Sequence, residues 1–119
     1  MGDEHTVPAL SQFGEFVARA VVPPPARIAA RNAVLDTVGV TLAGSNEPAA
    51  RLVRDVARAE GGAPRCGILG VAERSGAGWA ALANGTAAHA LDFDDMCFVS
   101  MAHPSAPLVA AGLAAAELA

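Results

Sequence analysis

Proline and glycine residues divide this chain into short segments, and this division limits the folds that it can adopt. The stretch PPPAR at residues 23–27, Gly44 and the pair Gly61 and Gly62 each interrupt a run of helix-forming residues. Proline is tolerated in the first turn of a helix, and glycine commonly follows the last turn. We therefore expect helices over residues 7–21, 24–43 and 47–60, with Ser45 or Asn46 capping the third.

Apolar residues recur at helical spacing within these three segments, which is typical of amphipathic helices. In the first segment they lie opposite Gln12, Glu15 and Arg19. In the third segment we expect Leu52, Val53 and Val56 to face inward. The apolar positions of the first two segments are Phe13, Phe16, Val17, Ala20 and Val21, then Ile28, Leu35, Val38 and Leu42.

The sequence of the second half of the chain predicts two more helices and at most one short strand. The run RCGILGV at residues 65–71 lies between glycines and is short enough for one strand or an extended connection. Ser75 is expected to open a helix that continues through Ala90, and Ser105 to cap a last helix with Pro107 in its first turn. The sequence therefore predicts an all-α fold with at most one short strand.

Composition indicates that the chain needs support from other polypeptide. Hydrophobic residues make up 53% of it but aromatic residues only 4%, so its core must consist of small aliphatic side chains that bury little area each. The last helix reaches Ala119 without a closing glycine or proline. We expect residues 1–119 to be a partial helical domain whose remainder is absent.

Charge and motif content exclude several classes of function. The net charge is −4 and the eight arginines are dispersed, which argues against nucleic acid as a partner. No apolar run approaches the length of a membrane span, and the acidic N-terminus does not match a secretory signal, although Gly2 and Thr6 fit an N-myristoylation pattern. Two cysteines without metal-ligand spacing fit a reducing, cytoplasmic setting.

The stretch ALDFDDMCFVSMAHPSAP at residues 90–107 concentrates Asp92, Asp94, Asp95 and His103 between two predicted helices. An imidazole can take or give a proton near neutral pH, and a loop held by two helices is a common place for catalytic groups. The amide N–H groups at the start of the helix after Ser105 would favour a bound carboxylate. The pattern predicts an acid–base site for a small anion.

Other interpretations of this cluster remain open at this point. Asp94 and Asp95 can instead cap or turn the chain, and a histidine at position 89 is more typical of a packed or hydrogen-bonded side chain than of a catalytic one. A divalent metal held by the aspartates and His103 is possible, but no ligand geometry is fixed by the spacing. The D-x-D-D pattern is also found as the general acid of terpene cyclases.

Three stretches in order, LDTVGVTLAGS, AALANGTAAHALDFDDM and HPSAPLVAAGLAAAE, resemble the N-terminal part of the MmgE/PrpD family. This family includes 2-methylcitrate dehydratase, cis-aconitate decarboxylase and iminodisuccinate epimerase. The resemblance implies a mainly helical large domain, a smaller lid domain, a homodimer and chemistry without cofactor or metal. It also implies that Asp92 and His103 are active-site residues. Neither the rest of the helical domain nor the lid domain is present in these 119 residues.

The expected function is that of a lyase of the 2-methylcitrate dehydratase type, which removes a proton next to a carboxylate and eliminates water from a small hydroxy di- or tricarboxylate. Decarboxylase-like members carry a threonine where this chain has Met96, and their loop before the histidine is one residue shorter. Both differences favour a dehydratase or an epimerase over a decarboxylase. The chain has no lysine to balance a substrate's charge, so we expect it to be inactive alone. The rival hypothesis is a noncatalytic, truncated helical module that requires a partner chain.

Overall fold

The computed structural model of the chain describes residues 8–119 and is mainly helical, as predicted. The expected start of the first helix at Val7 and the myristoylation pattern at Gly2 lie outside the described residues. The elements in chain order are α1 (Ala9–Arg19), α2 (Pro24–Gly44), α3 (Pro48–Glu60), β1 (Cys66–Ile68), β2 (Glu73–Ser75), α4 (Ala77–His89) and α5 (Ser105–Leu118).

The boundaries of α2 follow the proline and glycine signals, whereas the start of α3 does not follow the predicted cap. Helix α2 begins at Pro24 and ends at Gly44. Glu47 occupies the N-cap position of α3, and Pro48 is the first helical residue. Ser45 does not cap this helix because its hydroxyl group donates a hydrogen bond back to the carbonyl oxygen of Leu42, at 2.8 Å.

The strand expected near residues 65–71 is β1, and it pairs with a second short strand. Strands β1 and β2 are antiparallel, with Cys66 opposite Ser75 and Ile68 opposite Glu73. Gly70, in the connection between them, has a φ of +82°, which a glycine adopts without strain. The expectation that Ser75 opens α4 is wrong: Ser75 is buried as the last residue of β2, and Gly76 is the N-cap of α4.

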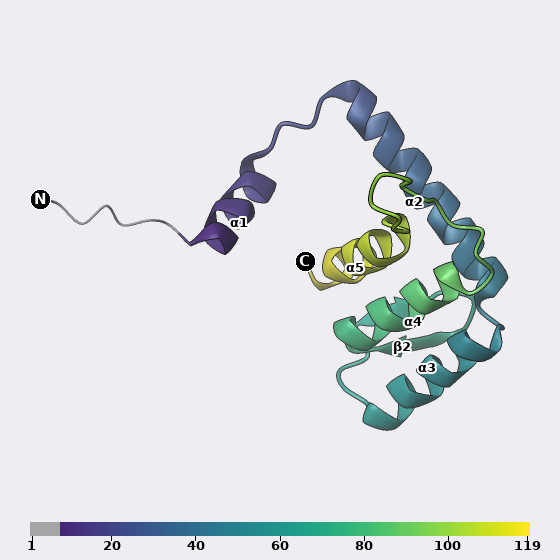
Figure 1. The fold of residues 1–119 in the computed structure, drawn as a ribbon. Coiled ribbons are helices and arrows are strands. Elements are labelled where there is room, and N and C mark those ends of the chain that lie inside the picture. Colours follow the sequence, from purple (N-terminus) through teal and green to yellow (C-terminus); the bar gives the residue numbers. More distant parts are fainter. Residues whose placement is uncertain (1–7) are drawn as a thin grey trace, which may run out of the picture.

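Helix α4 is the central element of the fold (Figure 1) and contacts α2, α3, α5 and both strands. It can do so because alanine and glycine dominate its sequence and allow neighbouring backbones to approach closely. At Gly85, for example, an added Cβ would just reach van der Waals contact with the carbonyl oxygen of Ala106 in α5, at 3.4 Å. The buried residues of α4 are Ala80, Ala83, Asn84, Ala87 and Ala88.

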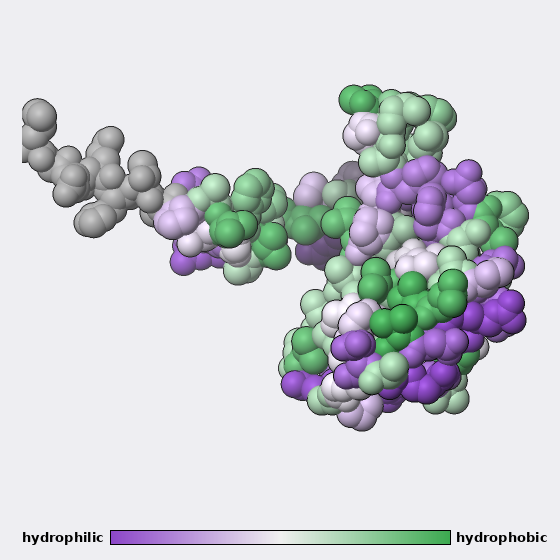
Figure 2. All heavy atoms as spheres, turned by 60° about the horizontal axis from the view of Figure 1, so that its bottom comes forward, coloured by the Kyte–Doolittle hydropathy of each residue, from purple (hydrophilic) through white to green (hydrophobic). Residues whose placement is uncertain are grey.

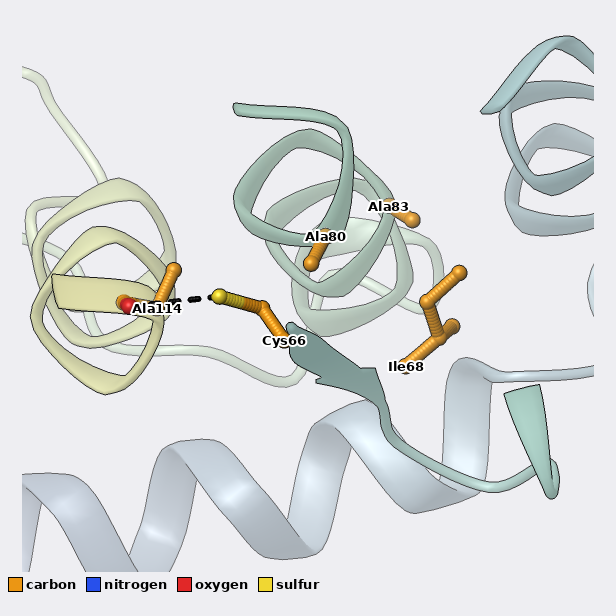
Figure 3. Packing of buried hydrophobic residues seen from close by; sticks show 5 residues of the cluster. All are labelled: Cys66, Ile68, Ala80, Ala83 and Ala114. Carbon is orange, nitrogen blue, oxygen red and sulfur yellow. Dashed lines mark hydrogen bonds between the residues drawn. The ribbon is translucent and has the colours of Figure 1, made fainter. Parts of the chain in front are cut away.

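The core has the small aliphatic composition that the sequence predicts. Its buried cluster joins β1, α4 and α5 through Cys66, Ile68, Ala80, Ala83 and Ala114 (Figure 3). The thiol of Cys66 is fully buried and donates a hydrogen bond to the carbonyl oxygen of Ala114, at 3.4 Å.

Most of the larger apolar side chains of α1 and α3 lie on the surface instead of facing inward. Leu52 is 68% exposed, and the residues of α3 that are buried are Ala50 and Ala57. The expected orientation of Leu52 and Val56 is therefore wrong, whereas Val53 is partly buried and packs against the core cluster, as predicted. Figure 2, in which the α3 end of the molecule comes forward, shows hydrophobic residues bordered by hydrophilic ones.

Helix α1 lies apart from the rest of the fold (Figure 1). None of its residues is buried, and Phe13 and Phe16 are each 68% exposed. Helix α1 therefore has the amphipathic pattern of a packed helix, but its apolar side does not pack against any other element among residues 8–119. Within the same residues, no helix combines the length and the apolar character that crossing a membrane requires.

Candidate active site

The segment between α4 and α5 folds back on itself and brings its two ends together. Cys97 and Ala102 form an isolated antiparallel bridge that closes the outer part of this loop. Asp92 and Met101 have φ values of 55° and 51°, in the left-handed region that non-glycine residues seldom occupy. These two turns direct the chain so that Asp92 and His103, eleven residues apart, become neighbours.

Asp92 and His103, the two residues expected to be catalytic, lie close together. The Nε2 atom of His103 is 3.8 Å from Oδ1 of Asp92. The side chain of Asp92 is 78% exposed, whereas that of His103 is 25% exposed. At this distance the carboxylate can orient the imidazole or exchange a proton with it through a small shift of either side chain.

Asp94 is the buried acid of the cluster and contacts two histidines. Its side chain is only 1% exposed, and its Oδ1 and Oδ2 atoms lie 3.0 and 3.1 Å from Nδ1 of His89. Its Oδ1 atom is also 3.3 Å from Nδ1 of His103. The two imidazole rings meet edge to face, with centroids 4.6 Å apart. His89 is therefore hydrogen-bonded, which is the interpretation that the sequence favoured.

Asp95 has a different role, because it caps α5. The backbone N–H of Ser105 donates to Oδ1 of Asp95 at 3.0 Å, and the Ser105 hydroxyl donates to Oδ2 at 2.7 Å. Ser105 is the first residue of the helix rather than its cap, and Pro104 is the N-cap. The capping interpretation thus applies to Asp95, and the predicted Ser105 cap is wrong.

This arrangement leaves fewer free amide groups at the start of α5 than the sequence predicts for a bound carboxylate. The Ser105 N–H is already bound by Asp95, and Pro107 has no N–H. The N–H of Leu108 donates to the carbonyl oxygen of Pro104. The helix terminus therefore holds the protein's own carboxylate, and among the described residues the N–H of Ala106, which lines the cavity, is left without a partner.

A cavity of about 750 Å³ lies beside the two histidines, between α4, α5 and the connecting loop. His89 and His103 supply the titratable groups of its lining, and Thr86 adds a hydroxyl group. Its walls are apolar and include Ala81, Leu82, Met101, Ala106 and Pro107. Among the described residues, those that line the cavity include no arginine. The cavity can therefore place acid–base groups beside a small molecule but supplies no permanent positive charge.

The same side chains could also hold a metal ion. One donor atom from each of His89, Asp92, Asp94 and His103 lies within 4.8 Å of the others. Imidazole and carboxylate groups suit zinc and several other divalent ions. In the structure, however, these atoms already contact one another, so an ion would have to displace the imidazole–carboxylate contacts.

The sequence that forms this site matches a known protein family. The family model described as the MmgE/PrpD N-terminal domain matches residues 9–119. The chain belongs to the MmgE/PrpD family. Searches for similar curated proteins and for similar solved structures gave no match. The part of the chain that matches MmgE/PrpD contains the whole acidic loop, both cavity-lining histidines and α5. The MmgE/PrpD family includes dehydratases and other lyases.

The sequence predicted Asp92 and His103 as site residues but did not single out Asp94. A group of aspartates after a helix does not show which of them the fold buries. One signal was available, because His89 is the last residue of α4 and Asp94 follows it by only five residues. Only the structure shows that this pairing also brings the carboxylate to His103.

Proposed function

We propose that the chain carries the acid–base site of a cofactor-independent lyase of the 2-methylcitrate dehydratase type. The observation that supports this most is the approach of Asp92 to Nε2 of His103, beside a cavity that His103 helps to line. Membership of a family that includes dehydratases adds to it. The substrate would be a small hydroxy di- or tricarboxylate.

In this reaction His103 removes the proton on the carbon next to a carboxylate. The electron pair of that C–H bond forms a carbon–carbon double bond, and the hydroxyl group on the neighbouring carbon leaves. The imidazolium returns the proton to the departing hydroxide, which is released as water. Asp92 orients the imidazole or passes the proton between His103 and solvent, for which its exposure suits it.

The chain alone lacks the charge to bind such a substrate. It contains no lysine, and the cavity lining offers no arginine. At the start of α5, Asp95 already binds the N–H of Ser105. We therefore propose that further polypeptide, comprising the rest of the helical domain and a lid domain, supplies the cations and that the complete protein is a cytoplasmic homodimer. The two free thiols, Cys66 and Cys97, agree with a reducing compartment.

The test is a substrate panel assayed with the 119-residue chain and, in parallel, with the longest protein that its gene encodes. The panel contains 2-methylcitrate, citrate, malate, cis-aconitate and iminodisuccinate. We expect the longer protein to form an unsaturated acid from 2-methylcitrate and the short chain to form none. The product is detected by its ultraviolet absorbance. Carbon dioxide release from cis-aconitate or epimerisation of iminodisuccinate would instead assign the decarboxylase or epimerase reaction. Turnover of none of the five contradicts the proposal.

One observation favours a second candidate, a noncatalytic helical module that requires a partner chain. The apolar side of α1, with Phe13 and Phe16, covers no other part of the described structure. Sedimentation of the isolated chain separates the two candidates when combined with the panel. A stable complex with a partner chain and no turnover by any assembled form would favour the module.

A further inference from the structure

The buried carboxylate of Asp94 lies between two imidazoles and is not needed to cap a helix or close the loop. The Ser105 cap belongs to Asp95, and the loop bridge is formed by Cys97 and Ala102. Asp94 instead contacts Nδ1 of His89 with both oxygens and Nδ1 of His103 with one. Both rings are thus approached by the same carboxylate at the same nitrogen.

The contact of Asp94 with His103 is within hydrogen-bonding distance, at 3.3 Å, but does not meet hydrogen-bond geometry. The Nδ1 atom of His103 is buried, and among the described residues no partner meets that geometry. A buried imidazole N–H without an acceptor is unfavourable, because it loses its hydrogen bond to water and gains none in return. Asp94 Oδ1, at 3.3 Å, is an acceptor that a small rotation of the ring would bring into line.

Hydrogen bonding at one ring nitrogen determines which nitrogen of a neutral histidine carries the proton. An ionised carboxylate only accepts hydrogen bonds, so an imidazole that binds it through Nδ1 must carry its proton there. Nε2 then has a free lone pair. In His103 this Nε2 is the atom that lies 3.8 Å from Asp92.

We propose that Asp94 is a positioning residue that holds His89 and His103 in the Nδ1–H tautomer and thereby presents Nε2 of both rings for proton transfer in the cavity. This inference rests on the proposed function for the use of Nε2, but the tautomers exist independently of turnover. His89 becomes a second acid–base group of the site, because it also lines the cavity and its side chain is about half exposed.

The test is the nitrogen NMR spectrum of chain labelled with ¹⁵N-histidine, recorded at a pH at which the imidazoles are neutral. Signals of the two rings are assigned with the variants His89→Gln and His103→Gln. We expect protonated Nδ1 and unprotonated Nε2 for both rings in the unmodified chain. In Asp94→Asn at least one ring should change toward the Nε2–H tautomer.

Asp95→Asn is the matched control, because it changes the same residue type at the next position without a contact to either histidine. It should leave both tautomers unchanged. An Nε2–H tautomer for either ring in the unmodified chain overturns the proposal, and so does an Asp94→Asn spectrum with both tautomers preserved. If Asp94→Asn does not fold, the spectrum of the unmodified chain alone decides.

A kinetic measurement separates this inference from the proposed function. In catalytic triads, replacing the carboxylate that orients a histidine by an amide lowers kcat by about 10⁴ with the geometry intact. In the longer gene product we expect Asp94→Asn to lower kcat at least about tenfold and to change KM little. Absence of turnover in the unmodified protein would contradict the lyase proposal while the NMR result still decides the role of Asp94.

Discussion

Gly44 in α2 packs directly against the backbone of Ala87 in α4, so closely that a Cβ at position 44 would overlap the Ala87 carbonyl oxygen. This contact fixes the long helix α2 against the central helix of the fold. Two residues further along α4 is His89, which contacts the buried carboxylate of Asp94. A glycine that looks like a simple helix stop in the sequence therefore also determines how close two helices can lie.

Gly44→Ala should destabilise the chain by about 1–3 kcal/mol, because the new methyl group forces α2 away from α4. Gly39→Ala is the matched control within the same helix. A Cβ there meets no other atom within 4 Å, so the substitution should stabilise the helix by about 0.5–1 kcal/mol. Urea unfolding followed by circular dichroism measures both changes, and equal effects at the two positions would refute the close packing.

Asp95 and Ser105 should be energetically coupled, because the Asp95 carboxylate binds both the N–H and the hydroxyl of Ser105. Asp95→Ala should cost about 0.5–2 kcal/mol through loss of the cap on α5. In a double-mutant cycle with Ser105→Ala, we expect a coupling energy of at least about 0.5 kcal/mol. Fully additive free energies of unfolding would show that the cap does not form.

Cys97 should react faster with iodoacetamide than an ordinary exposed cysteine. The Ser100 side chain first, and then the backbone N–H groups of Ser100 and Val99, lower the pKa of Cys97 by hydrogen bonding. A lower pKa means more thiolate at a given pH, so the midpoint of the rate–pH profile should lie at a lower pH. Ser100→Ala should move the midpoint upward. Cys66, which is fully buried, is the internal control and should stay unmodified in the folded chain.

Removal of divalent metal should leave the site intact. The donor atoms of His89, His103, Asp92 and Asp94 already contact one another, so their arrangement does not require an ion between them. We expect the same melting temperature with and without EDTA, and the same turnover by the longer gene product. A melting temperature or a rate that falls with EDTA and recovers with zinc would replace the acid–base account by a metal site.

The helix order was predictable from the sequence because prolines and glycines mark most of the boundaries. The inward faces were less predictable. In α3 the apolar pattern favoured Leu52, Val53 and Val56, but only Val53 packs against the core, and the fully buried residues of the helix are Ala50 and Ala57. Hydrophobicity alone does not show that a central helix is built for close backbone contact, and this tertiary constraint determined which face packs.

Part of the candidate site could also be predicted from the sequence. The motif at residues 92–103 predicted that an acid and an imidazole would meet, and Asp92 and His103 are neighbours. The sequence could not distinguish the three aspartates, because that distinction depends on the path of the loop. Positive φ values at Asp92 and Met101 set this path, exposing Asp92, burying Asp94 and turning Asp95 toward Ser105.

The most direct test of the account is the kcat of His103→Gln in the longest protein that the gene encodes, measured with the best substrate of the panel. General acid–base catalysis contributes about 10²–10⁴-fold to a rate, so we predict a loss of that size. His5→Gln, at a histidine outside the described residues, is the matched control and should keep the original rate. A His103→Gln protein that folds and turns over at the rate of the unmodified protein would contradict the central role of His103.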